Sequence, residues 1–149
     1  MTDGSEFIQR ARDLAPLLQE AGDEIERRRE LPEHVVKALI GGGFFRLLQP
    51  RFLGGAELRP VLFTQVTEAF AEANASAAWC VGQNNGCAMT AAYLDREVAR
   101  EMFGPPTGIL AWGPPGAPYE AQPVDGGYRI SGKWRFASGC AHARWLGAH

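Results

Sequence analysis

The residues best suited to bind a ligand lie in one short aromatic stretch, SGKWRFASGCAHARW, at positions 131–145. Alternation along a strand from Trp134 places Trp134, Phe136 and Ser138 on one face. Two rings followed by a hydroxyl would form a wall for a planar heterocycle, with one directional hydrogen bond. The same residues also suit a sheet core in which the rings pack and Ser138 and Gly139 make a bend, and periodicity does not distinguish the two interpretations.

A second polar group interrupts an otherwise apolar segment, SAAWCVGQNNGC, at residues 76–87. Its polar side chains are Gln83, Asn84 and Asn85. A helix here would be largely buried, and buried amides need hydrogen-bond partners. The segment is therefore expected to hold its amides against the protein interior or at its end.

Motifs for other chemistries are missing from the sequence. HExxH, paired CxxC, P-loop and GxSxG patterns do not occur, so zinc, phosphate-loop and serine-hydrolase sites are not predicted. His34 is expected on a helix surface, and His142, two residues after Cys140, makes a weak metal pair. We expect no metal site.

Helical patterns continue to about residue 105. Apolar residues at spacings of three and four predict a helix over residues 5–30, with Pro16 as an interruption. Further helices are expected over 32–40, from Pro60 to 70, over 76–87, and after Asp95, which can cap a helix that Gly104 ends.

From Gly108 onward the pattern changes to short segments rich in aromatic and branched residues. Five antiparallel strands are expected: GILAW, YEAQPV, YRISG, WRFAS and RWLGA. Asp125-Gly126-Gly127 supplies a tight hairpin turn. The prediction is an α+β fold, with an all-helical domain at 1–106 and the first strands of a β domain at 107–149.

Composition excludes several classes of protein. The 149 residues carry a formal charge of −2, with 15 basic residues matched by 17 acidic ones, so a nucleic-acid partner is not expected. The Arg27-Arg28-Arg29 run, flanked by glutamates, is interpreted as a solvated helix face. No signal peptide or membrane-spanning segment is recognised, which predicts a cytoplasmic protein with reduced thiols.

The order of helices followed by strands, with YRISGKWRFASGCAHARW after a Gly-Gly hairpin, resembles the acyl-CoA dehydrogenase fold family. The similarity is to its flavin-dependent monooxygenase branch, the two-component aromatic hydroxylases, and includes LPEHVVKALIGGGFFRLLQPRFLGG. The resemblance implies that Phe136 stacks on the flavin and that Ser138 acts as the catalytic hydroxyl beside flavin N5. It further implies that Trp112 and Gly113 contact the flavin ring through their backbone.

Departures from the family pattern refine these implications. AWGPPGAP, at 111–118, replaces the acidic, serine-bearing stretch of the dehydrogenases, which favours the oxygenase branch. Several hydroxylases carry a substrate-facing histidine where this chain has GQNNGCAM, so Asn84, Asn85 and Cys87 are expected to line the substrate pocket instead. The remaining sheet and the C-terminal four-helix bundle of the family are absent from the 149 residues.

The resemblance implies an enzyme that uses O2 and reduced FMN or FAD, delivered by a separate flavin reductase, to oxygenate a small aromatic substrate. Full-length family members are expected to be homo-tetramers. Two alternatives stay open: an acyl-CoA dehydrogenase-type flavoprotein, and a non-catalytic truncated fragment or interaction module. These 149 residues alone are expected to retain flavin weakly or not at all.

Overall fold

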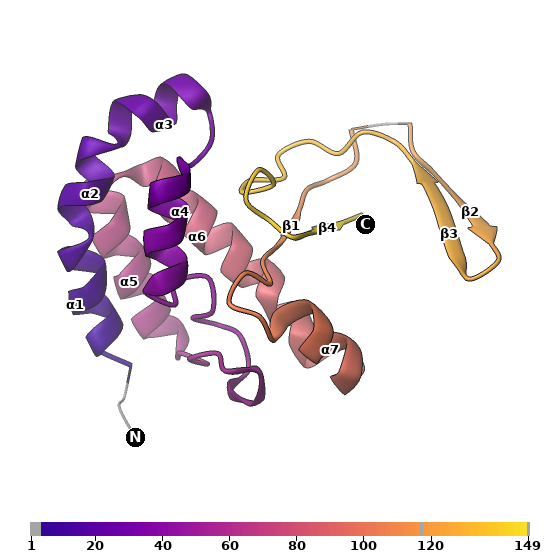
Figure 1. The fold of residues 1–149 in the computed structure, drawn as a ribbon, viewed down its shortest axis with the longest axis horizontal. Helices are drawn as coiled ribbons and strands as arrows, with labels where there is room; N and C mark the ends of the chain where they lie inside the picture. Colours follow the sequence, from indigo (N-terminus) through magenta and orange to yellow (C-terminus); the bar gives the residue numbers. More distant parts are fainter. Residues whose placement is uncertain (1–3, 117, 149) are drawn as a thin grey trace.

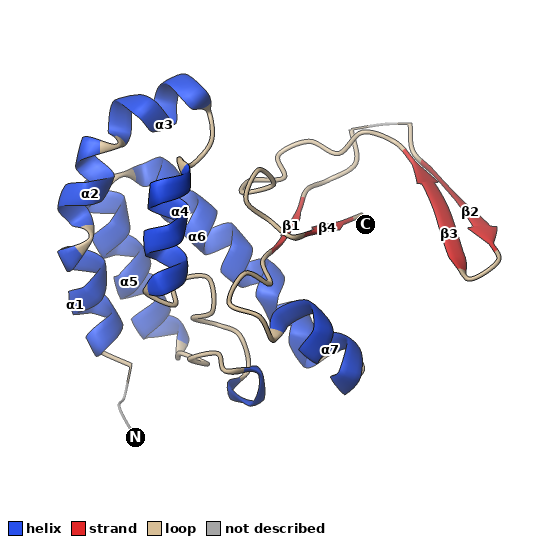
Figure 2. Ribbon diagram, in the orientation of Figure 1, coloured by secondary structure: helices blue, strands red, loops and turns tan. Residues whose placement is uncertain are grey.

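The computed structural model describes residues 4–116 and 118–148; residues 1–3, Ala117 of the AWGPPGAP stretch and His149 lie outside this description. Helices come first and short strands follow (Figure 1, Figure 2), which confirms the predicted α+β class. The helices are α1 (Glu6–Asp13), α2 (Ala15–Glu20), α3 (Gly22–Arg28), α4 (Glu33–Gly41), α5 (Pro60–Ala73), α6 (Ala75–Ala88) and α7 (Arg96–Phe103), with 3-10 turns η1 (Arg51–Leu53) and η2 (Met89–Ala92). The strands are β1 (Leu110–Trp112), β2 (Glu120–Val124), β3 (Gly127–Ser131) and β4 (Trp145–Gly147).

Proline and aspartate set several helix starts. The helix predicted over 5–30 is three helices, α1 to α3, and Pro16 lies in the first turn of α2, where its missing N–H removes no helical hydrogen bond. Pro60 begins α5 in the same way. The Asp95 side chain accepts a 2.8 Å hydrogen bond from the backbone N–H of Glu97, so the predicted cap of α7 is confirmed.

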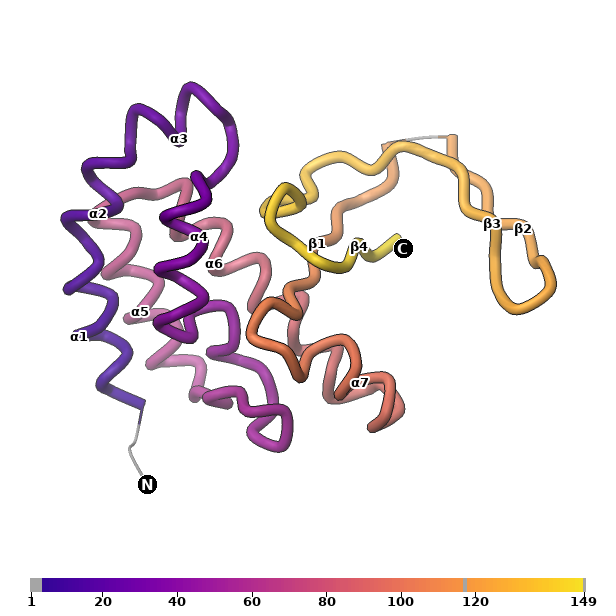
Figure 3. The backbone as a smooth tube through the Cα atoms, in the orientation of Figure 1, coloured from indigo at the N-terminus to yellow at the C-terminus, as the bar shows by residue number. Residues whose placement is uncertain are grey.

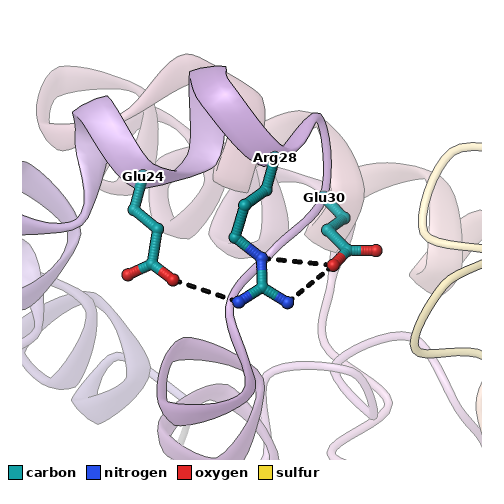
Figure 4. A network of polar contacts seen from close by, with 3 residues as sticks. All are labelled: Glu24, Arg28 and Glu30. Atoms are coloured by element: carbon teal, nitrogen blue, oxygen red, sulfur yellow. Dashed lines mark hydrogen bonds and ion pairs between the residues drawn. The ribbon is translucent and has the colours of Figure 1, made fainter.

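The arginine run at the end of α3 faces solvent. Arg28 bridges two glutamates (Figure 4), with Nη1 3.1 Å from Glu24 Oε1 and Nη2 2.7 Å from Glu30 Oε1. Arg27, Arg28 and Arg29 are all exposed, which confirms the interpretation of this run as a solvated face. Exposed ion pairs of this kind contribute little to stability because water screens them.

Two apolar clusters form the interior. The larger one lies among α1 to α6 and is centred on fully buried rings and aliphatic side chains, such as Phe44, Phe70 and Leu39. The smaller one joins the end of α6 to α7 and β1, through Cys87, Phe103 and Leu110. Because α6 contributes to both clusters, it is the element on which the strand segment is fixed.

Two separate two-stranded sheets follow the helices. The Asp125-Gly126-Gly127 turn is confirmed, because β2 and β3 pair antiparallel with Val124 opposite Gly127, and Gly126 has φ +78°. This hairpin is exposed along its whole length and extends away from the helices (Figure 1). The expectation that all strands pair antiparallel is wrong for β1 and β4, which pair parallel with Leu110 opposite Trp145.

The strand predicted over WRFAS does not form. Trp134 makes one isolated bridge to Pro115, and the residues that follow leave the extended conformation because Phe136 has φ +54°. The predicted alternation of Trp134, Phe136 and Ser138 on one strand face is therefore wrong. Instead, the segment between β3 and β4 curls back toward α6 (Figure 3).

Candidate functional site

The Ser138 hydroxyl is held by a side chain from the helical part of the molecule. Ser138 begins a tight turn over residues 138–142, and its Oγ accepts a 3.0 Å hydrogen bond from the indole Nε1 of Trp79 on α6. The Trp79 side chain is nonetheless 61% exposed. The contact therefore lies at the surface, where a ligand can reach both groups.

The backbone of the same turn is fixed by Asn84, one and a half helical turns further along α6. Asn84 is 1% exposed, and its Nδ2 donates to the Ser138 carbonyl at 3.3 Å and to the Leu110 carbonyl at 3.1 Å. One buried amide thus ties α6 both to β1 and to the turn. Both the hydroxyl and the carbonyl of Ser138 are positioned from α6.

Phe136 presents its ring to solvent two residues before this hydroxyl. The side chain is 84% exposed, and the backbone adopts φ +54°, a left-handed conformation that is rare for a bulky residue. Backbone conformations of this kind cluster at active sites and ligand-binding segments, which makes Phe136 a candidate site residue.

Gly113 lies against the backbone that carries Phe136. A Cβ at position 113 would overlap the Arg135 carbonyl oxygen and lie 2.8 Å from the Ala137 N, so only glycine allows this approach. Trp112, the preceding residue, is half-buried against the smaller apolar cluster. The structure therefore brings Gly113, Phe136 and Ser138, three of the predicted flavin-binding residues, into neighbouring segments.

Asn85 is turned toward the helical core. It is 0% exposed; its Oδ1 accepts from the backbone N–H groups of Leu47 and Leu48 at 2.7 and 3.1 Å, and its Nδ2 donates to the carbonyls of Phe44 and Val81 at 2.7 and 2.9 Å. These contacts fix the segment after α4 onto α6.

Cys87 is buried in the smaller apolar cluster. Burial raises the pKa of its thiol, while a backbone hydrogen bond from Trp112 acts in the opposite direction. The substrate-facing role predicted for Asn84, Asn85 and Cys87 stays a prediction, and the contacts that the structure gives these residues lie within the protein.

His142 joins the site although the sequence pattern gave it no role. Its Nε2 lies 2.9 Å from Asn84 Oδ1, and its ring centroid is 5.1 Å from that of Phe45. Burial lowers the pKa of His142 to about 4, so the imidazole is neutral near pH 7. Since Asn84 Nδ2 donates to two carbonyls, Asn84 Oδ1 must accept and His142 Nε2 must carry the hydrogen.

The contacts that Trp79 and Gly139 make at this site were not predicted from the sequence. Trp79 and Ser138 are 59 positions apart, so no local pattern connects them. The Ser-Gly pair at 138–139 was the available signal: Gly139 has φ +83°, and a Cβ there would overlap Asn84 Oδ1. A glycine directly after the candidate hydroxyl could have indicated a close approach by another segment.

Other kinds of site find little support in the described ranges. Residues 4–116 and 118–148 contain no group of three or more His, Cys, Asp or Glu side chains that could hold a metal ion. Cys80, Cys87 and Cys140 are free thiols. Over the same ranges, no helix combines the length and apolar character needed to cross a membrane.

A large cavity lies elsewhere in the described part of the chain. It has a volume of about 900 Å³ and is bordered by the start of α1, the end of α4 and the loop around η1. Its lining residues include Arg46, Arg51 and Arg59 but none of the residues predicted for the flavin site.

Comparison with known proteins identifies one family and several flavin-dependent relatives. Residues 4–105 match the family described as acyl-CoA dehydrogenase, N-terminal domain. The chain is 37% identical over 144 residues to a flavin-dependent monooxygenase, oxygenase subunit HsaA, of Rhodococcus jostii, covering 93% of this chain and 36% of the relative. It is 31% identical over 142 residues to the FADH(2)-dependent resorcinol hydroxylase, oxygenase component, of a Rhizobium species, covering 93% of this chain and 34% of the relative.

Solved structures have the same fold. The 3-HSA hydroxylase from Rhodococcus sp. RHA1 superimposes with a TM-score of 0.83 at 36% identity, over 95% of this chain and 36% of that protein. XiaF from Streptomyces sp., solved in complex with FADH2 and glycerol, gives a TM-score of 0.88 at 28% identity, over 96% of this chain and 36% of XiaF. The chain thus spans about a third of the length of the proteins it matches.

Proposed function

This chain belongs to the acyl-CoA dehydrogenase family through the N-terminal domain at residues 4–105, and we propose that it is the N-terminal part of a flavin-dependent monooxygenase. Its relatives are named as flavin-dependent monooxygenases and hydroxylases. The proposed substrate is a small aromatic molecule, since relatives are named for resorcinol and indole-3-acetate. In the complete protein, residues 1–106 would form the helical domain and 107–149 the start of the β domain.

One observation carries the proposal: an exposed Phe136 ring lies two residues from a hydroxyl that α6 holds in place. A flat apolar surface next to a directional polar group suits an isoalloxazine, which has an aromatic face and a polar edge. The residues present therefore fit a flavin. A cofactor of this kind is also named in the XiaF complex with FADH2.

The roles of the residues follow from their positions. Phe136 would pack against the flavin ring, and Ser138, the proposed catalytic hydroxyl, would hydrogen-bond near N5. Gly113 would let β1 pack on the backbone that carries Phe136, and the backbone of Trp112 and Gly113 is proposed to contact the ring. Asn84, Asn85 and Cys87 are proposed on the substrate side.

A reduced flavin, FMN or FAD, when bound would supply the electrons that activate O2 for insertion of one oxygen atom into the substrate. This chemistry requires a separate flavin reductase as a partner. The protein's contribution is to bind and orient the ring and to exclude water from it. The proposed assembly is a homo-tetramer of the complete protein in the cytoplasm.

The test uses the complete gene product, because the 149 residues alone are expected to bind flavin weakly. Affinities for FMN and FAD, oxidised and reduced, are measured by fluorescence. Oxygen uptake and product formation are then followed with a reductase and a panel of phenols and indoles. Oxygen incorporation into one of these substrates supports the proposal. Reduction of bound oxidised flavin by an acyl-CoA would identify a dehydrogenase instead, and a protein that binds no flavin would favour the non-catalytic alternative.

Phe136→Leu tests directly whether the exposed Phe136 ring contacts the flavin. The loss of an aromatic contact is worth roughly 0.5–1.5 kcal/mol, so flavin affinity should fall about 2- to 10-fold. Tyr128→Leu is the matched control, since Tyr128 is another exposed ring (70%) but lies on the β2–β3 hairpin. Equal effects of the two substitutions would remove Phe136 from the proposed site.

A further inference from the structure

The hydrogen bond between Trp79 and Ser138 constrains the direction in which the serine hydroxyl can act. An indole N–H only donates, so Ser138 Oγ is the acceptor in this 3.0 Å contact and Trp79 cannot receive the serine hydrogen. A hydroxyl has one donor and two lone pairs, so its O–H remains available for a different partner.

Within residues 4–116 and 118–148, Ser138 Oγ makes one side-chain hydrogen bond, which it accepts from Trp79. No protein group in these ranges accepts the serine hydrogen. The Ser138 carbonyl is meanwhile fixed by Asn84 Nδ2. The backbone position and the lone-pair direction of this serine are thus set separately, by two side chains of α6.

We propose that Trp79 is a positioning residue that makes Ser138 a hydrogen-bond donor to the bound flavin. This inference rests on the proposed function, and it names the residue that occupies one lone pair of Ser138 Oγ and so orients the hydroxyl. The acceptor on the flavin would be one of its carbonyl oxygens or imine nitrogens. The Trp79 ring is 61% exposed, and its indole N–H is the group that contacts Ser138.

The decisive variant is Trp79→Phe, which keeps an aromatic ring and removes the N–H. Trp145→Phe is the matched control, because the Trp145 indole N–H also donates a hydrogen bond, 3.1 Å to the Met102 carbonyl, away from Ser138. Ser138→Ala and the double variant Trp79→Phe/Ser138→Ala complete a double-mutant cycle.

The cycle is measured on the complete gene product as the dissociation constant of oxidised FAD or FMN, whichever binds more tightly. Trp79→Phe should weaken binding about 3- to 10-fold, and adding it to Ser138→Ala should weaken binding no further. Trp145→Phe should leave the affinity within about 2-fold of wild type.

The contact itself has a readout that needs no flavin. In a ¹H–¹⁵N spectrum, Ser138→Ala should shift the Trp79 indole resonance and leave that of Trp145 in place. An unmoved Trp79 resonance, or additive losses of affinity in the cycle, would overturn the inference.

The two proposals can fail separately. A wild-type protein that binds flavin while Trp79→Phe binds it equally well overturns the role of Trp79 alone. A wild-type protein that binds neither FMN nor FAD overturns the proposed function, and the inference about Trp79 with it.

Discussion

The imidazole of His142 and the amide of Asn84 form a partly buried link between the turn at 138–142 and α6, with Nε2 2.9 Å from Oδ1. The same Asn84 amide donates to carbonyls of β1 and of the turn. A neutral histidine is therefore part of the structure that holds Ser138 in place, and its protonation state affects the fold.

The stability of the protein should fall as the pH is lowered through the range from 6.5 to about 4. The pKa of His142 is lowered by burial from 6.5 to about 4, so the unfolded chain takes up a proton in this range before the folded one does. The contribution is fully present above pH 6.5 and lost below about 4. A shift of this size corresponds to an upper limit on the order of 3 kcal/mol.

His142→Gln isolates this effect, because a glutamine Nε2 can also donate to Asn84 but does not titrate. Urea unfolding at pH 7 and pH 4.5 should show a smaller loss of stability in His142→Gln than in the wild type. His34→Gln, which replaces an exposed histidine on α4, is the matched control. Identical pH dependence in wild type and His142→Gln would contradict the assignment.

Asn85→Ala should destabilise the helical part strongly. The substitution leaves two backbone N–H groups, of Leu47 and Leu48, and the Phe44 carbonyl without their partner in the interior. Buried unsatisfied groups cost roughly 1–3 kcal/mol each, so a loss of about 3 kcal/mol in the free energy of unfolding is expected. Gln83→Ala, an exposed amide on the same helix, should cost less than about 0.5 kcal/mol. Similar denaturation midpoints for the two variants would refute a structural role for Asn85.

The effects of substituting Arg46 and Gln49 on stability should be coupled, because both side chains donate to the same backbone carbonyls near the end of α7. Arg46 Nη2 donates to the carbonyls of Leu53, Phe103 and Gly104, and Gln49 Nε2 donates to Leu53 and Phe103 at 3.2 and 2.9 Å. Either donor can partly replace the other at two of these oxygens.

Arg46→Met should therefore cost only about 1 kcal/mol, because Gln49 still serves two of the three carbonyls. The double variant with Gln49→Leu should cost more than the sum of the single ones, by about 1 kcal/mol or more, as measured by chemical denaturation. Arg100→Met, an exposed arginine on α7, is the control for a lost surface charge. Strict additivity would show that the two donors act independently.

The elements that local rules could predict are those whose signals lie within a few residues. Pro60 and Asp95 marked helix starts, and Asp125-Gly126-Gly127 marked the hairpin. The expected WRFAS strand failed because its aromatic composition resembles a strand, while its conformation is set by distant contacts. Gly113 packs on the Arg135 backbone, and Phe136 adopts φ +54° beside it.

The candidate site was predictable in part for the same reason. Phe136 and Ser138 were proposed from their residue types and from the family resemblance, whereas the strand alternation that put them on one face is wrong because Phe136 has φ +54°. The partners of Ser138 come from α6, 54 and 59 positions earlier in the chain, and a single sequence carries no signal for that pairing.

Gly139→Ala should disrupt the turn at 138–142 in two ways, through backbone strain and through a steric overlap with Asn84. Gly126→Ala is the control, because it introduces the strain without the overlap. Gly139 has φ +83°, and its added Cβ would overlap Asn84 Oδ1; Gly126 has φ +78°, and its added Cβ would meet nothing within 4 Å. Both alanines carry the cost of a left-handed backbone, roughly 1–2 kcal/mol. Gly139→Ala must in addition displace the buried Asn84 amide.

The difference in the free energy of unfolding between the two variants therefore measures the cost of the overlap with Asn84. Gly139→Ala should be less stable than Gly126→Ala by at least about 1 kcal/mol, since displacing Asn84 breaks buried hydrogen bonds. It should also shift the Trp79 indole resonance, because Ser138 moves with the turn, whereas Gly126→Ala should leave that resonance unchanged. Equal destabilisation with an unmoved Trp79 signal would mean that the turn does not pack on Asn84 in solution.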